Sequence, residues 1–167
     1  MRHILLLSAA FAAISLAPAY ADDSGGIEQV VVTATRTEQP AAKTGESISV
    51  VTAQDLQATQ TSIVSDALAQ TPGTIVVRGG GVGQTTTISL RGAEAGQSVV
   101  LIDGVRLNDP SSVDNEAVLG DLLVNSVSRI EVLRGPQSTL YGSDAIGGVV
   151  NIITKRGGEG FNANALA

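Results

Sequence analysis

Short apolar runs separated by turn-forming residues recur along most of the chain. Each run is rich in Val, Ile and Leu and is bounded by Gly, Asp, Asn or Ser, which is typical of short β-strands. Asp103-Gly104 separates two of these runs and predicts a tight hairpin. The pattern predicts strands at Ser47–Val51, Thr74–Val77, Thr87–Leu90, Val99–Ile102, Val105–Leu107, Ser128–Leu133 and Val149–Thr154.

Both ends of this region carry further β-like patterns. Ile27–Thr35 is a short run rich in Val and Thr, and the polar stretch Thr37–Glu46, which contains Pro40, is typical of a linker. At the other end, Phe161–Leu166 alternates polar and apolar residues, which indicates the start of one more strand.

Helical patterns are few and short. Thr52-x-x-Asp55 resembles a capping box and predicts a helix at Ala53–Ala58. Apolar residues four apart predict a second helix at Ile63–Gln70, which Pro72-Gly73 would end. Asp121–Val124 fits a single helical turn. Short helices, many strands and long loops indicate a small α+β domain with a mixed central sheet.

The first 21 residues have the layout of an export signal. Met1-Arg2-His3 is a short basic region, Ile4–Ala17 is apolar, and Ala19-Tyr20-Ala21 is a small-x-small cleavage site. A short membrane anchor is the alternative, but the apolar run is too short to span a bilayer comfortably. We therefore expect residues 1–21 to be a signal peptide and the mature protein to be exported.

Composition excludes several classes of function. The chain of 167 residues has 10 basic and 16 acidic residues, and its net charge of −6 argues against nucleic-acid binding. It contains no Cys, and its one His, His3, lies in the expected signal peptide. Disulfides, thiolate metal sites and His-based catalysis are therefore not expected. We predict a protein that is not an enzyme and has no cofactor.

Two loops have compositions that could suit a ligand site. The Gly-rich loop Gly79–Gly83 lacks the Lys-Ser/Thr pair of a phosphate-binding loop. The acidic residues Asp109, Asp114 and Glu116 offer oxygen ligands for Ca²⁺, but their spacing is not that of an EF-hand. A solvated acidic loop is the simpler interpretation, and no metal site is predicted.

Four motifs in order resemble one known family. They stand at Glu28–Arg36, Ser98–Val105, Ile130–Pro136 and Tyr141–Ile152, the last reading Tyr-Gly-Ser-Asp-Ala-Ile-Gly-Gly-Val-Val-Asn-Ile. Behind an export signal, this set resembles the plug domain of TonB-dependent outer-membrane receptors. Within that family the chain is most similar to cobalamin receptors, through the three segments Arg36–Pro40, Gly83-Gln84 and Asp103–Asn108.

The first motif resembles a TonB box, the segment through which the periplasmic domain of TonB pulls on such receptors. A β-prone tether can add as a strand to the edge of a partner's sheet, where main-chain hydrogen bonds provide affinity. An ordinary first strand of the domain is the alternative. The resemblance favours the coupling segment, which comprises Glu28, Gln29, Val30, Val31, Val32, Thr33 and Ala34.

The resemblance also assigns roles to charged strand ends. Arg91-Gly92 and Arg134-Gly135 each follow a strand, and the matching family arginines pair with carboxylates on the barrel wall. Buried guanidinium groups need such partners, whereas in this chain alone a solvated arginine is the expected state. Glu131 is close in sequence to Arg134 and could supply a local partner.

Ligand contacts are expected in the outward-facing loops, which the resemblance places at Gly79–Thr87 and Asn108–Val113. Small polar side chains there suit a large polar ligand. Position 94 carries a glutamate where a cobalamin receptor would be expected to have an amide. This difference argues against cobalamin as the exact ligand. The alternative is that these are simply polar loop residues. The residues that align with ligand contacts are Thr85, Thr87, Glu94, Ser112 and Val113.

The resemblance implies that the chain is the gate of a receptor for active uptake of a large nutrient. Cobalamin is the first expected nutrient, and a siderophore or other metal chelate is the alternative. The alternatives are a periplasmic binding module without a barrel and a truncated product without function. We expect residues 22–46 to be the TonB box and linker, 47–157 the plug, and 158–167 the truncated start of a first barrel strand. A fragment of a longer receptor in the outer membrane is the favoured interpretation, with its own barrel as a partner. A complete chain would be periplasmic.

Overall fold

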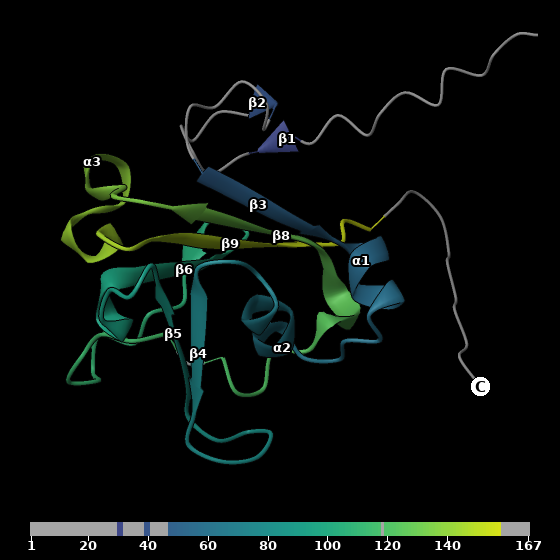
Figure 1. Ribbon diagram of the computed structural model, residues 1–167, viewed down its shortest axis with the longest axis horizontal. Coiled ribbons are helices and arrows are strands. Elements are labelled where there is room, and N and C mark those ends of the chain that lie inside the picture. The colour runs from purple at the N-terminus through teal and green to yellow at the C-terminus, as the bar shows by residue number, and fades with distance from the viewer. Residues whose placement is uncertain (1–29, 32–38, 41–46, 118, 158–167) are drawn as a thin grey trace, which may run out of the picture.

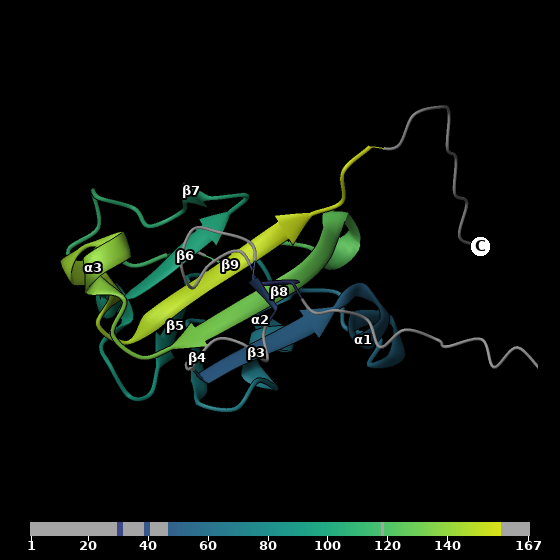
Figure 2. The ribbon, with the colours of Figure 1, turned by 90° about the horizontal axis from the view of Figure 1, so that it is seen from above.

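A mixed five-stranded sheet forms the centre of the protein. The computed structural model describes residues 30–31, 39–40, 47–117 and 119–157. The strand order is β3-β8-β9-β6-β7, in which β6 and β9 run parallel and the other neighbours are antiparallel (Figure 2). This confirms the expected α+β class. The strands are β3 (Ser47–Thr52), β8 (Val127–Arg134), β9 (Gly148–Thr154), β6 (Ser98–Ile102) and β7 (Val105–Arg106).

Two short helices cover one face of this sheet. α1 (Ala53–Ala58) begins at Thr52, whose hydroxyl accepts a hydrogen bond from Asp55 N at 3.2 Å while the Asp55 carboxylate accepts one from Thr52 N at 2.8 Å. This confirms the expected capping box. α2 (Val64–Ala69) also lies where the apolar spacing predicted it. The main core lies between the helices and the sheet, and at its centre are Val64, Leu68, Ile130, Val132, Val150 and Ile152.

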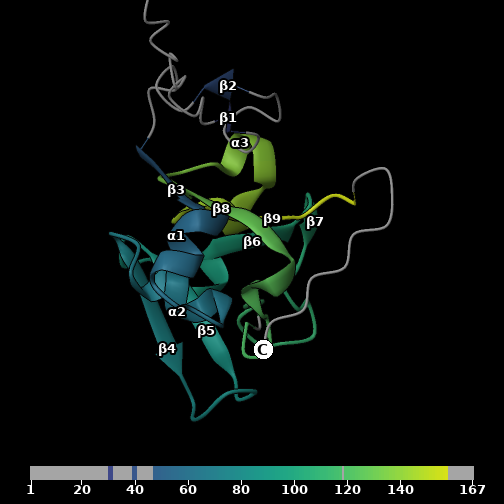
Figure 3. The same cartoon turned by 90° about the vertical axis from the view of Figure 1, so that its right-hand side faces the viewer.

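A second, separate sheet projects from the main one. β4 (Thr74–Arg78) and β5 (Thr86–Leu90) form an antiparallel hairpin that extends away from the central sheet (Figures 1 and 3). Arg78 at the end of β4 pairs with Asp66 and donates to Ser65 Oγ at 2.8 Å, so α2 braces the hairpin. The two strands were expected; their independence from the central sheet was not.

The opposite face of the central sheet is covered at one end by α3 (Ser138–Tyr141) and the 3₁₀ turn η4 (Ser143–Ala145). A second cluster packs there, with Val99, Leu133, Val149 and Ala145 fully or almost fully buried. β9 then enters between β8 and β6 through Gly148, whose φ of +146° and close approach to Leu133 O exclude a side chain. Val149–Thr154, expected as the last strand of the domain, is thus a central strand.

Several smaller features differ from the prediction or lie beyond it. The helical turn expected at Asp121–Val124 is instead a 3₁₀ turn, η3, at Val124–Ser126. Leu123 forms an antiparallel bridge with Ile63, and η3 begins directly after it. Among the described residues, no helix is long and apolar enough to cross a membrane. The expected signal peptide (1–21) and residues 158–167 lie outside the described residues.

The N-terminal segment contributes two very short strands. β1 (Val30–Val31) pairs antiparallel with β2 (Gln39–Pro40), which falls within the stretch expected to be a linker. The pair lies over the central sheet, on the side opposite α2 and the β4–β5 hairpin (Figures 1 and 3). Within the expected coupling segment, Glu28–Ala34, the structure describes Val30 and Val31, and the other five residues lie outside the described residues.

Candidate functional site

The first expected ligand loop is the tip of the β4–β5 hairpin. Gly79 N donates to Thr85 O at 2.8 Å, which closes the loop at its base, and Gly83 N donates to Gly120 O at 3.2 Å, which anchors its tip. A Cβ at Gly120 would lie 2.4 Å from Gln84 O, so the two segments fit together only because residue 120 has no side chain. Backbone contacts therefore hold this loop in one shape.

The second expected loop, Asn108–Val113, is continuous with the residues up to Glu116 and is held by its own side chains. Asp109 Oδ1 accepts hydrogen bonds from Ser111 N at 2.8 Å and Ser111 Oγ at 2.6 Å. The Ser111 hydroxyl and then its backbone N–H favour the charged carboxylate and lower the pKa of Asp109. Ser112 Oγ accepts from Glu116 N at 3.1 Å and so spans the loop. The Asp109 carboxylate is used in turn formation, and the described residues contain no cluster suited to a metal ion.

Asn108 anchors the base of this loop to the central sheet. Its side chain is 7% exposed. Asn108 Oδ1 accepts from Val100 N at 3.1 Å, and Nδ2 donates to Ser98 O at 3.2 Å and to Asn115 O at 2.9 Å. One amide thus satisfies two groups of β6 and one of the loop. No motif around Asn108 in the sequence indicates this role.

A second anchor joins the far end of the loop to the turn before β9. Asp144 Oδ2 accepts from Asn115 Nδ2 at 2.9 Å and from Arg106 Nη1 at 2.9 Å. Arg106 Nη2 also donates to Tyr141 O at 2.6 Å. The three charged or amide side chains come from β7, the loop and η4, so one network fixes three segments that are remote in sequence.

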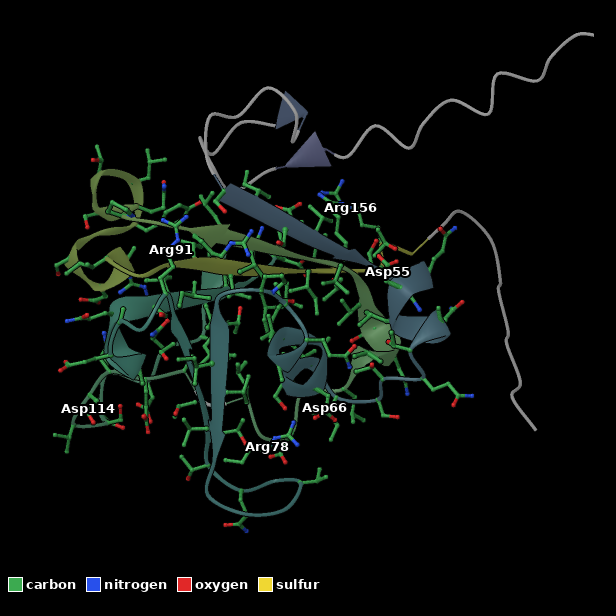
Figure 4. The ribbon with its side chains drawn as sticks, in the orientation of Figure 1. Asp55, Asp66, Arg78, Arg91, Asp114 and Arg156 are labelled. Carbon is green, nitrogen blue, oxygen red and sulfur yellow. The ribbon has the colours of Figure 1, made fainter. Side chains whose placement is uncertain are left out.

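A third contact places the turn η2 (Ala95–Gln97) beside the same loop. A Cβ at Gly96 would lie only 1.7 Å from Asp114 O, which shows how closely the two backbones approach. Glu94 is the residue that precedes this turn. Figure 4 shows Asp114 on the same lower side of the molecule as Arg78 and the hairpin.

The five expected ligand residues occupy different environments. Thr85, Glu94 and Val113 are exposed, and Val113 is fully so, at 102%. Thr87 and Ser112 are half-buried, and Ser112 is engaged in the loop. The turn that follows Glu94 approaches the loop of Ser112 and Val113 through Gly96 and Asp114. The hairpin residues Thr85 and Thr87 are positioned through Gly120 and Leu119, whose N–H donates to Thr86 O at 3.1 Å.

The two expected wall-facing arginines differ in their surroundings. Arg91 is exposed and adopts φ of +54°, and its Nη1 lies 3.2 Å from the position of a Cβ on Gly135. Arg134 Nη1 donates to Pro72 O, while its Nε is buried with no hydrogen-bond partner. Among the described residues, neither arginine forms an ion pair.

The expectation that Glu131 offers Arg134 a local partner is wrong. Glu131 is fully buried and accepts from Arg129 Nε at 2.6 Å. Residues two apart on a strand share a face, whereas residues three apart face opposite sides. Arg129 and Glu131 on β8 therefore meet, and Arg134 is directed away from both.

The family of the chain follows from comparison with a family model. Residues 40–149 match the model of the TonB-dependent receptor plug domain. This match covers more than half of the chain and includes β3, β8, β6 and β7 of the central sheet and the first two residues of β9. The chain belongs to the TonB-dependent receptor plug domain family.

Solved structures with the same fold are outer-membrane receptors for iron chelates. A variant of the ferric enterobactin receptor PfeA from Pseudomonas aeruginosa is 32% identical, with a TM-score of 0.53, over 66% of this chain and 18% of that one. The ferric yersiniabactin uptake receptor FyuA from Yersinia pestis is 32% identical, with a TM-score of 0.50, over 66% of this chain and 17% of that one.

A third structure aligns over more of the chain. The ferripyoverdine receptor of the P. aeruginosa outer membrane is 25% identical, with a TM-score of 0.62, over 81% of this chain and 17% of that one. The present chain thus spans less than a fifth of the length of the receptors that it matches. The family is one of receptors and transporters, not a class of enzymes.

Proposed function

We propose that this domain is the ligand-contacting gate of an outer-membrane receptor that actively imports a large metal chelate. Membership of the plug family carries the proposal. The two loops, which carry the exposed Thr85 and Val113, add support, because both are held in shape before any ligand arrives. Preorganised loops lose less conformational entropy on binding than free ones.

Ferric siderophores are the first candidate ligands. The solved relatives are receptors for ferric enterobactin, ferric yersiniabactin and ferripyoverdine, and two of them share 32% identity with this chain. Cobalamin, itself a metal chelate, is the second candidate. The segments Arg36–Pro40, Gly83-Gln84 and Asp103–Asn108 favour it, whereas Glu94 does not. Thr85, Thr87, Glu94, Ser112 and Val113 are the proposed contact residues.

Arg134 is the better supported of the two arginines proposed to contact the barrel wall. Its Nε is buried without a partner, and an acceptor from a surrounding barrel would satisfy it. Arg91, exposed beside Gly135, is the second such residue. Glu131 is already engaged by Arg129, so its proposed role is to hold that arginine and not to face the wall.

Ligand binding by the full-length gene product tests the choice of cargo. We expect saturable binding of a ferric siderophore, measured by intrinsic fluorescence or calorimetry. Glu94→Lys should weaken this binding at least about tenfold if the chelate is cationic at that contact. The same variant should strengthen the binding if the chelate is anionic there. Asp121→Lys changes charge equally at another exposed position and serves as the control. Saturable binding of cobalamin with none of any ferric siderophore would assign the second candidate. Binding of neither would contradict the proposal.

Energy coupling is proposed to use Glu28–Ala34 as the strand that pairs with the periplasmic domain of TonB. Deleting Glu28–Thr33 should abolish that binding and leave the far-UV circular dichroism spectrum unchanged. Deleting Asp22–Ile27 removes the same number of residues just upstream and should leave binding intact. If TonB bound the first variant as well as the unsubstituted chain, the coupling assignment would be wrong.

Export and outer-membrane placement complete the proposal. Cleavage after Ala21 would give a mature protein that begins at Asp22. Mass spectrometry of the protein recovered from the cell envelope checks this directly. An uncleaved N-terminus would contradict the signal-peptide assignment.

A further inference from the structure

The two proposed ligand loops are both attached to the same short stretch of chain. In the described part of the chain, no hydrogen bond joins the hairpin loop Gly79–Thr87 directly to the second loop Asn108–Val113. Any coupling between the loops must therefore pass through residues that contact both. These residues follow the second loop in sequence and form what we call the strap: Glu116, Ala117, Leu119, Gly120 and Leu122.

The strap begins as part of the closure of the second loop. Asp109 N donates to Glu116 O at 3.0 Å, and Glu116 N donates to Ser112 Oγ at 3.1 Å. Ala117, which is buried, forms an antiparallel bridge with Asn108. The second loop therefore cannot open at its base without releasing this end of the strap.

The middle of the strap holds the hairpin loop. Leu119 N donates to Thr86 O at 3.1 Å, and Gly83 N donates to Gly120 O at 3.2 Å. The Leu119 side chain is fully buried in the main core, so the strap cannot shift alone. A Cβ on Gly120 would collide with Gln84 O, so this close approach requires a residue without a side chain.

The far end of the strap closes a ring with α2 and the hairpin. Val64 N, in the first turn of α2, donates to Leu122 O at 2.9 Å. The next two residues of α2, Ser65 and Asp66, both bind Arg78 at the end of β4 (Figure 4). The strap, α2 and the hairpin are thus each bonded to the other two. Energetic coupling can travel through a contiguous network of this kind.

We propose that the strap makes the two ligand loops one cooperative unit, and that Gly120 is the positioning residue on which the coupling depends. The inference rests on the proposed function, which assigns ligand contacts to these loops. A backbone bond lost in either loop frees part of the strap, and the other loop then loses the segment to which it is bonded. Both loops should therefore open locally with similar free energies.

Coupled loops would respond to a large chelate differently from independent ones. A chelate that contacts Thr85 and orders the hairpin loop would also order the loop of Ser112 and Val113, and that ordering would not have to be repeated for a second contact. Contacts in the two loops would reinforce one another. A ligand large enough to reach both would therefore be favoured over one that contacts either loop alone.

Hydrogen exchange of the full-length gene product, measured by mass spectrometry without ligand, tests the coupling. Gly120→Ala should accelerate exchange at least about tenfold both in peptides that cover residues 79–87 and in peptides that cover 109–117. Exchange in β8 and β9 should change less than about twofold, since the backbone bonds of the strap go to the loops and to α2. As the control, Gly157→Ala adds the same methyl group where no heavy atom lies within 4 Å and should leave all these rates unchanged.

A milder change in the second loop tests whether a disturbance is transmitted. Ser112→Ala removes the acceptor of Glu116 N and no group of the hairpin loop. It should accelerate exchange at 109–117 and, through the strap, at 79–87, by factors that agree within about threefold. In the Gly120→Ala background the same substitution should accelerate 109–117 further and leave 79–87 unchanged. A merely structural glycine would not abolish transmission, so this loss is the readout specific to a positioning role.

Ser112→Ala keeps the test decisive if Gly120→Ala unfolds the domain. Acceleration confined to 109–117 in Ser112→Ala would overturn the proposal. Equal acceleration over the whole domain would overturn it too, because it would indicate a general loss of stability. An unchanged rate at 109–117 would remove the first link of the coupling, with the same result. In a folded Gly120→Ala variant, acceleration at 79–87 without acceleration at 109–117 would also contradict the coupling.

Failure of this inference and failure of the proposed function give different results, because exchange is measured without ligand. If the loops are coupled but the full-length product binds neither a ferric siderophore nor cobalamin, the coupling stands and the proposed function fails. If a chelate binds saturably but the two loops exchange independently, the proposed function stands and the coupling fails.

Discussion

Asn115 and Asp144 are 29 residues apart in sequence and are joined by a hydrogen bond of 2.9 Å from Nδ2 to Oδ2. The same Asp144 oxygen accepts from Arg106 at 2.9 Å. A carboxylate shared by an amide and a guanidinium is a charge-assisted arrangement, which is stronger than a bond between neutral groups. It links the proposed ligand loop to the turn from which β9 enters the central sheet.

Replacing Asp144 by alanine should therefore loosen the loop more than it destabilises the domain. Asp144 is 31% exposed, so we expect a loss of about 1 kcal/mol in the free energy of unfolding, measured by urea denaturation. Amide hydrogen exchange across residues 109–116 should accelerate by more than the global change accounts for. Asp114→Ala, an exposed change in the same loop, is the control. Uniform acceleration over the whole domain would contradict a local anchoring role.

Asn108 should be the more sensitive of the two anchors. Asn108→Ala leaves Val100 N, Ser98 O and Asn115 O without their partner in a buried position. We expect a loss of about 2–3 kcal/mol in the free energy of unfolding, since unpaired buried polar groups are costly. The exposed Asn125→Ala should change it by less than about 0.5 kcal/mol. Similar losses in both variants would show that the Asn108 network is not specific.

A methyl group at Gly96 should displace the ligand loop. The added Cβ would meet Asp114 O at 1.7 Å, so one of the two backbones must move. Gly96→Ala is expected to weaken chelate binding by about tenfold or more, corresponding to roughly 1.4 kcal/mol of lost contact energy. Gly157→Ala, outside both ligand loops, places its methyl where no heavy atom lies within 4 Å and should leave affinity unchanged. Unaltered binding in Gly96→Ala would show that the loop near Asp114 does not contact the ligand.

Acid should remove the stabilisation provided by Asp103. Its carboxylate accepts from Thr154 Oγ1 at 2.6 Å and Thr154 N at 3.0 Å, and the hydroxyl, followed by the N–H and by the nearby Arg156, lowers its pKa below the ordinary 3.8. Because the folded-state pKa is lowered, this stabilisation is present above the unfolded-state pKa and is lost as the pH falls through the folded-state pKa.

Asp103→Asn tests that dependence. At neutral pH the variant should unfold more easily by less than about 1 kcal/mol, because the carboxylate is largely exposed. The difference should shrink as the pH is lowered beneath 3.8, where the native carboxylate also becomes protonated. Urea denaturation at pH 7 and at several acidic values provides the comparison. A constant difference across that range would exclude the titration of Asp103 as its cause.

Local patterns predicted most of the secondary structure. The capping residues Thr52 and Asp55 defined the start of α1, and Asp103-Gly104 gave the β6–β7 turn, in which both residues adopt positive φ. These features depend on neighbours in sequence, which is why they can be inferred from it. By contrast, the turn expected at Asp121–Val124 was displaced, because Leu123 pairs with Ile63 from another part of the chain.

The candidate site was less predictable than the fold. The motifs located both ligand loops but gave no indication that Asp144 and Arg106 hold one of them, since these residues meet only after α3 and β7 have packed. The expected pairing of Arg134 with Glu131 failed for a simple geometric reason: proximity in sequence is not proximity in space on a strand, where alternate residues face opposite sides. A two-residue spacing would have identified Arg129 instead.

The strand order has a consequence for how the chain reaches its folded state. β3 begins at Ser47 and pairs with β8, whose end is Arg134, while β9 inserts between β8 and β6. When the N-terminus emerges first, β3 stays unpaired until most of the domain has emerged, because β8 is its neighbour in the described central sheet. Such long-range pairings slow folding, since a large loop must close before any contact is gained. With this topology, the central sheet cannot be completed until the last strands in sequence, β8 and β9, are available for pairing.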